Sequence, residues 1–505
     1  MSSLSEDPNF SKLRAALWPI QNSELKKFLP LGGMMFLVLF SYTLLRNIKD
    51  ALVVTAPSCG AEVIPFIKLW DLPIAFLFFL LYAKLSNTLS RANLFYACLI
   101  PYLLFFAAFA FYIYPNREFF HPSEETISIL REICPHLKWF ISLYGIWSFA
   151  LFYILSDLYG SIVIGLLFWQ FANEITRTSE AKRFYSFFGF LGNMALISSG
   201  TFGGYLADLN SQLSSPSEAW TLSITYMLTA AIVSGCGVLL LYKWMDRYVL
   251  TDPHYYDAAK SVGNKKEDNK PKLSVSESLR YLLSSKYLGF IALLVISYGI
   301  TANIIDVTWK SQLKEYFPEA NDYFRFMAGF SFWTGIATMT FILFTKGIVR
   351  RFGWFTGAMV TPSVFLVTTL LFFSFILFKD IFEESLLFFG ITSLCMAVFI
   401  GAAQNILGKG MKYSLFDPTK EMTYIPLDQE LKVKGKAAVD VIGSRLGKSG
   451  GGFIQLTLLT LTAGTQMTIM PYLSGLILVI MMIWMGAVKG LSRLYSEKVQ
   501  LKDSN

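Results

Sequence analysis

Long apolar segments recur along this chain, and short polar segments separate them. A run of about 20 apolar residues can cross the hydrocarbon core of a bilayer as an α-helix. The pattern predicts twelve such spans, at residues 28–48, 63–83, 92–114, 139–172, 185–206, 221–242, 287–306, 323–345, 355–378, 385–407, 437–463 and 469–488. The fourth is too long for one perpendicular helix, so we expect it to tilt, kink or protrude.

One polar segment, residues 243–286, divides the predicted spans into two sets of six. It contains SVGNKKEDNKPK, whose charges and proline are typical of a solvated linker. Six spans on each side of a central linker is a layout of major-facilitator-type carriers. The sequence therefore predicts an all-α membrane protein, major-facilitator-like, with twelve transmembrane helices in two six-helix halves. The expected parts are an N-tail at 1–27, bundles at 28–242 and 287–488, the linker at 243–286 and a C-tail at 489–505.

Basic residues are divided unequally between alternate loops. Of the 43 Lys and Arg, 31 lie in the two tails and the loops predicted on the same side, and 7 lie in the opposite loops. Because cytoplasmic loops carry an excess of Lys and Arg, both termini are predicted to be cytoplasmic.

Composition excludes several classes of function. The chain is 54% hydrophobic and 15% charged, whereas soluble domains carry about 25% charged residues, so a soluble enzyme is a poor fit. The net charge of +8 follows from the loop asymmetry, and no nucleic-acid partner is expected. The five Cys and three His show no metal-ligand or disulfide spacing, and no metal or cofactor is expected.

Charged side chains inside the spans are the candidates for function, because each costs about 2.5–3.5 kcal/mol at mid-span. The first span ends FSYTLLRNIKDALVV, where Arg46, Lys49 and Asp50 lie between apolar runs. Arg46 and Asp50 are four apart, share a helix face and can pair. The alternative is a helix end whose side chains reach the membrane interface.

Two acidic residues lie in later spans. Asp157 has no charged neighbour for about fifteen residues on either side, which favours a carboxylate facing a cavity over one beside a kink at Gly160. Asp306 lies near the outer end of the seventh span. Lys310 follows four residues later, so a surface ion pair between them is an alternative interpretation.

The eleventh span contains DVIGSRLGKSGGG at 440–452. Its glycine and lysine spacing is one residue shorter than that of a phosphate-binding loop, and no strand precedes it. Arg445 and Lys448 lie three apart on one face, and the surrounding glycines allow close approach to the backbone. The alternative is a close-packed helix crossing whose lysine reaches the cytoplasm.

Two lysines and two carboxylates spread over both halves suit an anionic solute such as the phosphates of a nucleotide. The carboxylates would neutralise the lysines in the empty carrier. They could also bind protons, because burial favours the neutral form of a carboxylate.

Several long segments resemble the nucleotide transporter family, the ATP/ADP translocases of intracellular bacteria and plastids. The resemblance extends over nearly all spans, and its most specific blocks are KYSLFDPTKEMTYIPLD and VKGKAAVDVIGSRLGKSGG. It implies a carrier that moves nucleotides by alternating access without hydrolysing them, and so not an enzyme. It also implies a multi-pass protein of a bacterial inner membrane, in contact with lipid and expected to work as a single chain.

Four charged positions matter for transport in that family. The resemblance places them on Lys49, Asp157, Asp306 and Lys448, which are therefore predicted to bind substrate. Typical exchangers of the family carry Glu at both acidic positions and Leu-Arg-Asp-Thr-Lys-Asp in the first span, whereas this chain has Asp157, Asp306 and LRNIKD. Because some members import nucleoside triphosphates with protons, these departures favour proton-coupled import, with Asp157 and Asp306 as proton sites. ATP/ADP exchange is the alternative.

Overall fold

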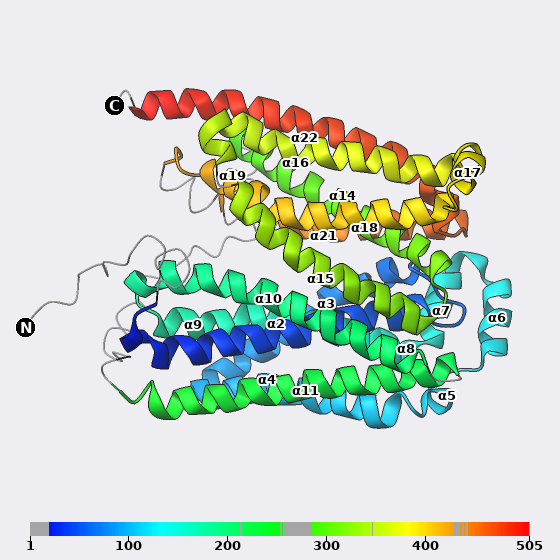
Figure 1. The fold of residues 1–505 in the computed structure, drawn as a ribbon, viewed down its shortest axis with the longest axis horizontal. Helices are drawn as coiled ribbons and strands as arrows, with labels where there is room; N and C mark the ends of the chain where they lie inside the picture. The colour runs from blue at the N-terminus through cyan, green and yellow to red at the C-terminus, as the bar shows by residue number, and fades with distance from the viewer. Residues whose placement is uncertain are drawn as a thin grey trace, which may run out of the picture.

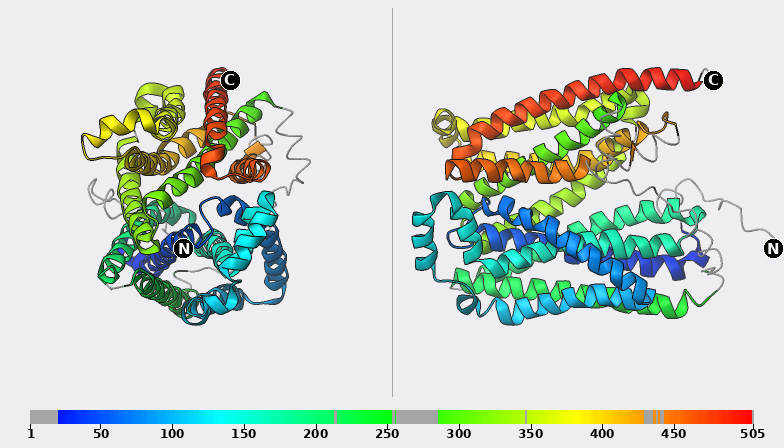
Figure 2. Two further views of the ribbon diagram at one scale, coloured as in Figure 1. Left: turned by 90° about the vertical axis from the view of Figure 1, so that its right-hand side faces the viewer. Right: turned by 180° about the vertical axis from the view of Figure 1, so that it is seen from behind.

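The computed structural model describes residues 20–212, 215–252, 255, 285–345, 347–428, 435–436, 439 and 443–503. Within these ranges every regular element is a helix. The helices form two bundles, one above the other in Figure 1 and seen end-on in the left view of Figure 2. The described ends of the chain lie at the same end of the molecule (Figure 1).

The N-terminal bundle is built on its first long helix, α2 (Leu25–Val54), which packs against α8, α10 and α11. The longer elements of this bundle are α3 (Val63–Thr88), α4 (Arg91–Ala108) with the π-helix η2 (Phe109–Ile113), α10 (Thr178–Asn210) and α11 (Pro216–Tyr248). The shorter ones are η1 (Asn22–Glu24), α5 (Arg117–Phe120), α6 (Glu124–Ile133) and η3 (Pro135–Leu137).

The predicted fourth span is interrupted, as its length required. It consists of α7 (Lys138–Gly145), α8 (Trp147–Tyr159), the π-helix η4 (Gly160–Phe168) and α9 (Trp169–Ile175). The π-helix begins at Gly160, where a Cβ would lie 2.3 Å from the ring of Tyr42 on α2. Glycine therefore allows this span to pass close to α2, three residues after Asp157.

The C-terminal bundle is built on α14 (Lys286–Tyr316), which packs against α18, α21 and α22. Its other elements are α15 (Ala320–Thr345), α16 (Ile348–Leu377), α17 (Lys379–Leu387), α18 (Ser393–Met411), η5 (Lys412–Phe416), α19 (Asp417–Met422), α21 (Ser444–Thr462) and α22 (Gln466–Asp503). Most of the predicted linker lies outside the described residues, so domain boundaries at 28–242 and 287–488 remain a proposal.

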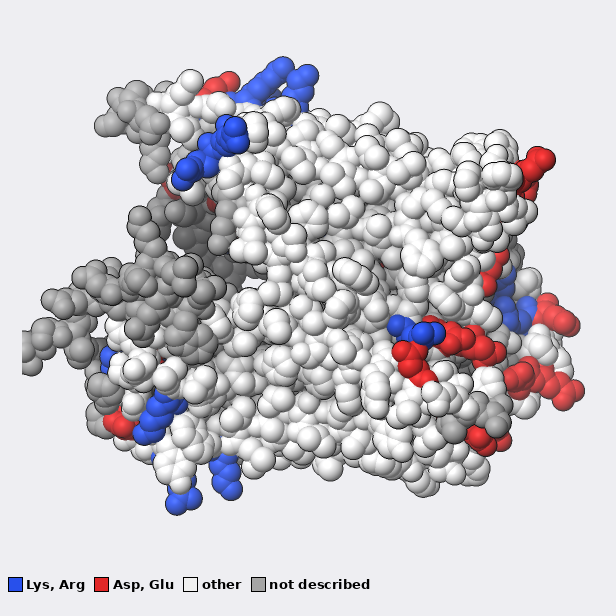
Figure 3. Space-filling model, in the orientation of Figure 1, with Lys and Arg blue, Asp and Glu red and all other residues white. Residues whose placement is uncertain are grey.

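The outer surface suits a lipid environment. On the face in Figure 3, a wide belt without charged residues separates two charged ends. Large apolar side chains such as Phe76 and Phe344 are exposed on the helices. Among the described residues, ten helical segments are long and apolar enough to cross a membrane.

Helices α10 and α21 are not among those ten, and both lie where the two bundles meet. Helix α10 packs against α15, and α21 packs against α3. A Cβ on Gly200 of α10 would lie 2.6 Å from the carbonyl oxygen of Ala328 on α15. Helices that face other helices need less apolar surface, and small residues let their backbones approach closely.

Hydrogen bonds join the two bundles at the end opposite the described chain ends (Figure 1). The Lys138 ammonium donates to the carbonyl oxygen of Ala463 at 2.5 Å, and the Trp139 indole N–H donates to that of Gly464 at 3.0 Å. Ala463 and Gly464 form the turn between α21 and α22. The interface is therefore closed at this end.

The glycine-rich stretch of α21 packs directly on α14. A Cβ added to Gly299 would lie 2.6 Å from the Cα of Gly447, and one on Gly451 would lie 2.9 Å from the carbonyl oxygen of Ile300. The close-packed helix crossing that the sequence left open is therefore present, and Gly447 places the backbone of Lys448 beside α14.

A larger side chain at Gly299 should disrupt the packing of α14 against α21. Gly299→Val is expected to lower the stability of the detergent-solubilised protein by about 1–3 kcal/mol, because the facing atoms belong to backbone and cannot turn away. Gly329→Val on α15 is the matched control, since no atom lies within 4 Å of its added Cβ. Thermal unfolding of the two variants measures the difference, and equal melting temperatures would contradict the packing argument.

Candidate functional site

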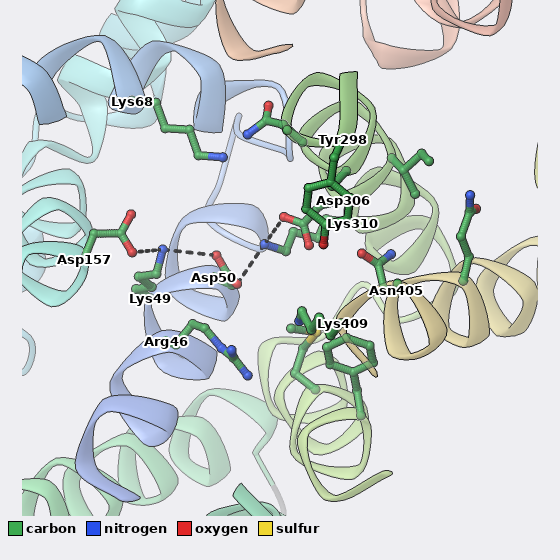
Figure 4. A pocket seen from close by; sticks show the side chains of 18 of the residues that line it. Arg46, Lys49, Asp50, Lys68, Asp157, Tyr298, Asp306, Lys310, Asn405 and Lys409 are labelled. Carbon is green, nitrogen blue, oxygen red and sulfur yellow. Dashed lines mark hydrogen bonds and ion pairs between the residues drawn. The ribbon is translucent and has the colours of Figure 1, made fainter. Parts of the chain in front are cut away.

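A cavity of about 380 Å³ lies between the two bundles, lined from α2, α3, α8, α14, α15, α16 and α18. It is rich in charged side chains that both bundles contribute (Figure 4). The charged residues of its lining are Arg46, Lys49, Asp50, Lys68, Asp157, Asp306, Lys310 and Lys409. Five cationic side chains against three carboxylates give this lining a formal net charge of +2.

A chain of ion pairs crosses the cavity from one bundle to the other (Figure 4). Lys49 Nζ lies 2.8 Å from Asp157 Oδ1 and 3.8 Å from Asp50 Oδ1. Lys310 Nζ lies 2.9 Å from Asp50 Oδ2 and 2.8 Å from Asp306 Oδ2. Because Asp50 is on α2 and Lys310 is on α14, their contact links the halves.

The lysines of this chain are deeply buried. The side chain of Lys49 is 5% exposed, and its ammonium lies 3.4 Å from the centroid of the Tyr153 ring. The side chain of Lys310 is 7% exposed. Close carboxylates offset the cost of burying an ammonium, and an aromatic face adds cation–π attraction.

Three of the four predicted site residues line this cavity: Lys49, Asp157 and Asp306. The side chain of the fourth, Lys448, lies outside the described part of the structure, as does that of Arg445. The backbone of Lys448 belongs to α21 and follows Gly447, which packs on the cavity-lining Gly299.

Two predicted pairings have different outcomes. The pairing of Arg46 with Asp50 is wrong, because Asp50 is bound by Lys310 and Lys49 and the Arg46 guanidinium donates to Ser331 Oγ at 3.4 Å. Lys310 does pair with Asp306, but inside the cavity rather than at the surface. Helix α14 continues to Tyr316, ten residues beyond the predicted end of the span, and so keeps both side chains within the bundle.

Sequence reasoning missed Lys68 and Lys409 as members of the site. Lys68 lies near the start of α3 between apolar residues, so the cost of a charge in a span could have identified it. Lys409 was assigned to a loop because the tenth span was ended at residue 407. Helical structure continues from α18 through η5 and α19 to Met422, which brings Lys409 into the cavity lining.

Two helical bundles around a polar cavity form a major-facilitator-like fold. The fold is similar to that of a bacterial homologue of the iron transporter ferroportin in an inward-facing state, with a TM-score of 0.56 and 12% identity, covering 95% of this chain and 99% of that one. The predicted all-α, major-facilitator-like fold class is confirmed. Similarity at this level of identity concerns the fold alone.

Sequence comparison is more specific. The profile of the TLC ATP/ADP transporter family matches residues 3–495. ADP,ATP carrier protein 1 of Chlamydia muridarum is 48% identical over 498 residues, which cover 98% of this chain and 93% of that relative. The plastidic ATP/ADP-transporter of Solanum tuberosum is 46% identical over 95% of this chain and 74% of its own length. The protein belongs to the TLC ATP/ADP transporter family, and it is a multi-pass nucleotide transporter rather than an enzyme.

Proposed function

We propose that this protein exchanges ATP for ADP across a membrane by alternating access, with the charged cavity as its substrate site. The net charge of +2 on a cavity that both bundles line is the observation that carries the proposal. Nucleotide phosphates are anions, and a site shared by two bundles can open to either side when the bundles rock against each other. The names of the chlamydial and plastidic relatives also favour exchange.

Within this cavity we assign substrate binding to Lys49, Asp157 and Asp306. Lys448 joins them as a proposal that rests on the family resemblance and on the position of its backbone beside α14. The ion pairs of Lys49, Asp157 and Asp306 neutralise their charges within the site, so the positive charge left for substrate phosphates is the excess of two.

We propose ATP/ADP exchange in place of the proton-coupled import that the sequence favoured. Asp157 and Asp306 are each engaged by a lysine at 2.8 Å, so neither is an unoccupied proton acceptor while these ion pairs are intact. Because the empty cavity keeps two formal positive charges in excess, its return without a bound anion is unfavourable, which suits exchange of one nucleotide for another.

Reconstituted liposomes test this proposal directly. Labelled ATP should enter liposomes that contain ADP and should fail to enter empty ones, and GTP, CTP and UTP supplied outside define the base preference. A proton gradient alone should drive no uptake. Uptake into empty liposomes under a proton gradient would instead establish proton-coupled import, and the absence of nucleotide transport would overturn the proposal.

We also propose that the protein resides in a bacterial inner membrane with both termini cytoplasmic and works as a single chain. The described chain ends share one end of the molecule, and the face in Figure 3 carries mostly Lys and Arg at that end and mostly Asp and Glu at the other. A cytoplasmic excess of Lys and Arg supports this orientation. The end closed by Lys138 and Trp139 would then be the outer end, and the conformation would face inward.

A further inference from the structure

Two lysines of the cavity stand apart from the chain of ion pairs. Lys49 and Lys310 each contact two carboxylates. Among the described residues, no carboxylate forms an ion pair with Lys68 or Lys409, although both line the same cavity. The positive charge that remains for a ligand therefore resides largely on these two ammonium groups and on Arg46.

The two lysines come from opposite bundles. Lys68 belongs to α3 and Lys409 to α18, and they extend into the cavity from opposite walls (Figure 4). The Lys409 ammonium lies 4.4 Å from the centroid of the Phe330 ring, which supports a cation but does not neutralise it. A ligand that contacts both lysines would connect the two bundles.

A neutral polar group lies beside Lys68. Asn303 Oδ1 is buried and has no hydrogen-bond partner among the described residues. A Cβ placed on Gly452 would lie 3.9 Å from this oxygen and 4.0 Å from Lys68 Cδ, so the amide and the lysine stem are neighbours. An unpaired buried acceptor is costly, and a ligand hydroxyl or amino group could satisfy it.

We propose that Lys68 and Lys409 hold the phosphate chain of the nucleotide between the two bundles, while Lys49 and Lys310 remain in the ion-pair chain through Asp50. The proposal rests on the function proposed above and specifies how the substrate is recognised. A phosphate chain with several charges can bind both ammonium groups at once, whereas a monophosphate offers a single phosphate group to the two walls. The site would thus select nucleoside di- and triphosphates over monophosphates.

Nucleotide binding to the full-length, detergent-solubilised protein tests the assignment. Lys68→Gln and Lys409→Gln are each expected to weaken ATP and ADP binding about 10- to 100-fold, as loss of a charged hydrogen bond does. AMP binding should change less than threefold, so the ratio of AMP to ATP dissociation constants should fall. Arg in place of either lysine keeps the charge and should restore most of the affinity for ATP.

The control variant is Lys84→Gln, which removes an exposed lysine from the same helix α3 and should bind ATP like the unmodified protein. If the two cavity variants keep the affinity for ATP, or lose ATP and AMP binding equally, the phosphate-chain assignment is wrong. The unmodified protein should still exchange nucleotides in liposomes in that case. Absence of that exchange would instead overturn the proposed function.

Discussion

Lys49→Gln is expected to reduce ATP uptake into ADP-containing liposomes by on the order of 100-fold or more. Removal of one member of a buried ion pair costs about 3–5 kcal/mol, because the remaining charge is left without a partner. Lys49 is the shared partner of Asp157 and Asp50, and its side chain is 5% exposed. Among the described residues Asp50 would keep only Lys310 as an ion-pair partner, and Asp157 would face the phosphates of the substrate with its charge uncompensated.

The measurement is the initial rate of labelled ATP uptake, normalised to the amount of folded protein in the membrane. Lys26→Gln is the matched control on the same helix α2, because this lysine is 41% exposed and lies 3.7 Å from Asp252. Exposed pairs of this kind contribute about 0–1 kcal/mol, so the control should retain its rate within a few fold. A Lys49→Gln variant with the control's rate would remove Lys49 from the mechanism.

A substitution of Asp157, the ion-pair partner of Lys49, distinguishes exchange from proton-coupled import. Asp157→Asn should also slow uptake, since it leaves Lys49 with Asp50 at 3.8 Å as its remaining carboxylate contact among the described residues. Under the exchange mechanism the dependence of the remaining rate on external pH should be unchanged. A flattened pH profile in this variant would show that the carboxylate carries a proton and would favour proton-coupled import.

The architecture of the chain could be predicted because the requirement for apolar spans acts locally on each segment. Hydropathy identified the helices that face lipid, and the central polar segment separated the two bundles. The ends of the helices were predicted least accurately. Helices α2 and α14 continue six and ten residues beyond the predicted ends at 48 and 306, because their polar residues are compensated by ion pairs that span the two helices.

The site was predicted only in part, because the pairing of its charges depends on contacts between distant segments of the chain. Depth in the spans selected Lys49, Asp157 and Asp306, and the family resemblance selected the same residues, but neither reveals which charge neutralises which. Asp50 pairs with Lys310, which is 260 residues away along the chain, and such contacts depend on how the two bundles meet. Lys409 was missed because its span was ended too early, although it lines the charged cavity.

The second large effect is expected at the closed end of the interface, where Glu62 on the N-terminal bundle contacts the start of α22. Glu62 is 7% exposed, and its carboxylate accepts the backbone N–H of Gln466 at 2.9 Å. The first N–H groups of a helix have no partner within the helix, and its N-terminus attracts anions. Glu62 thus caps a helix of the opposite bundle.

Lys138 makes the complementary contact at the end of α21. Its ammonium donates to the carbonyl of Ala463, and a cation is favourable at a helix C-terminus. The turn between α21 and α22 is therefore held from the other bundle by an anion on one side and a cation on the other. These contacts must break if the bundles separate at this end, so their loss should favour the conformation that is open there.

The reactivity of the Cys59 thiol can be used to measure such opening. Cys59 is 7% exposed, its backbone carbonyl accepts a hydrogen bond from Lys314, and burial raises the pKa of its thiol to about 12. At neutral pH the thiol is therefore protonated and unreactive while this end is closed. Opening would hydrate the thiol and return its pKa toward about 8.5, which increases the reactive thiolate.

In a variant that keeps Cys59 as its only cysteine, Glu62→Ala combined with Lys138→Ala should accelerate labelling by a membrane-impermeant maleimide at least tenfold. Each lost charged hydrogen bond is worth about 1.5–3 kcal/mol, so the open population should rise by one order of magnitude or more. Lys379→Ala, an exposed lysine on α17 at the same end, should leave the rate unchanged. If the double variant labels no faster than this control, Glu62 and Lys138 do not hold this end of the interface closed.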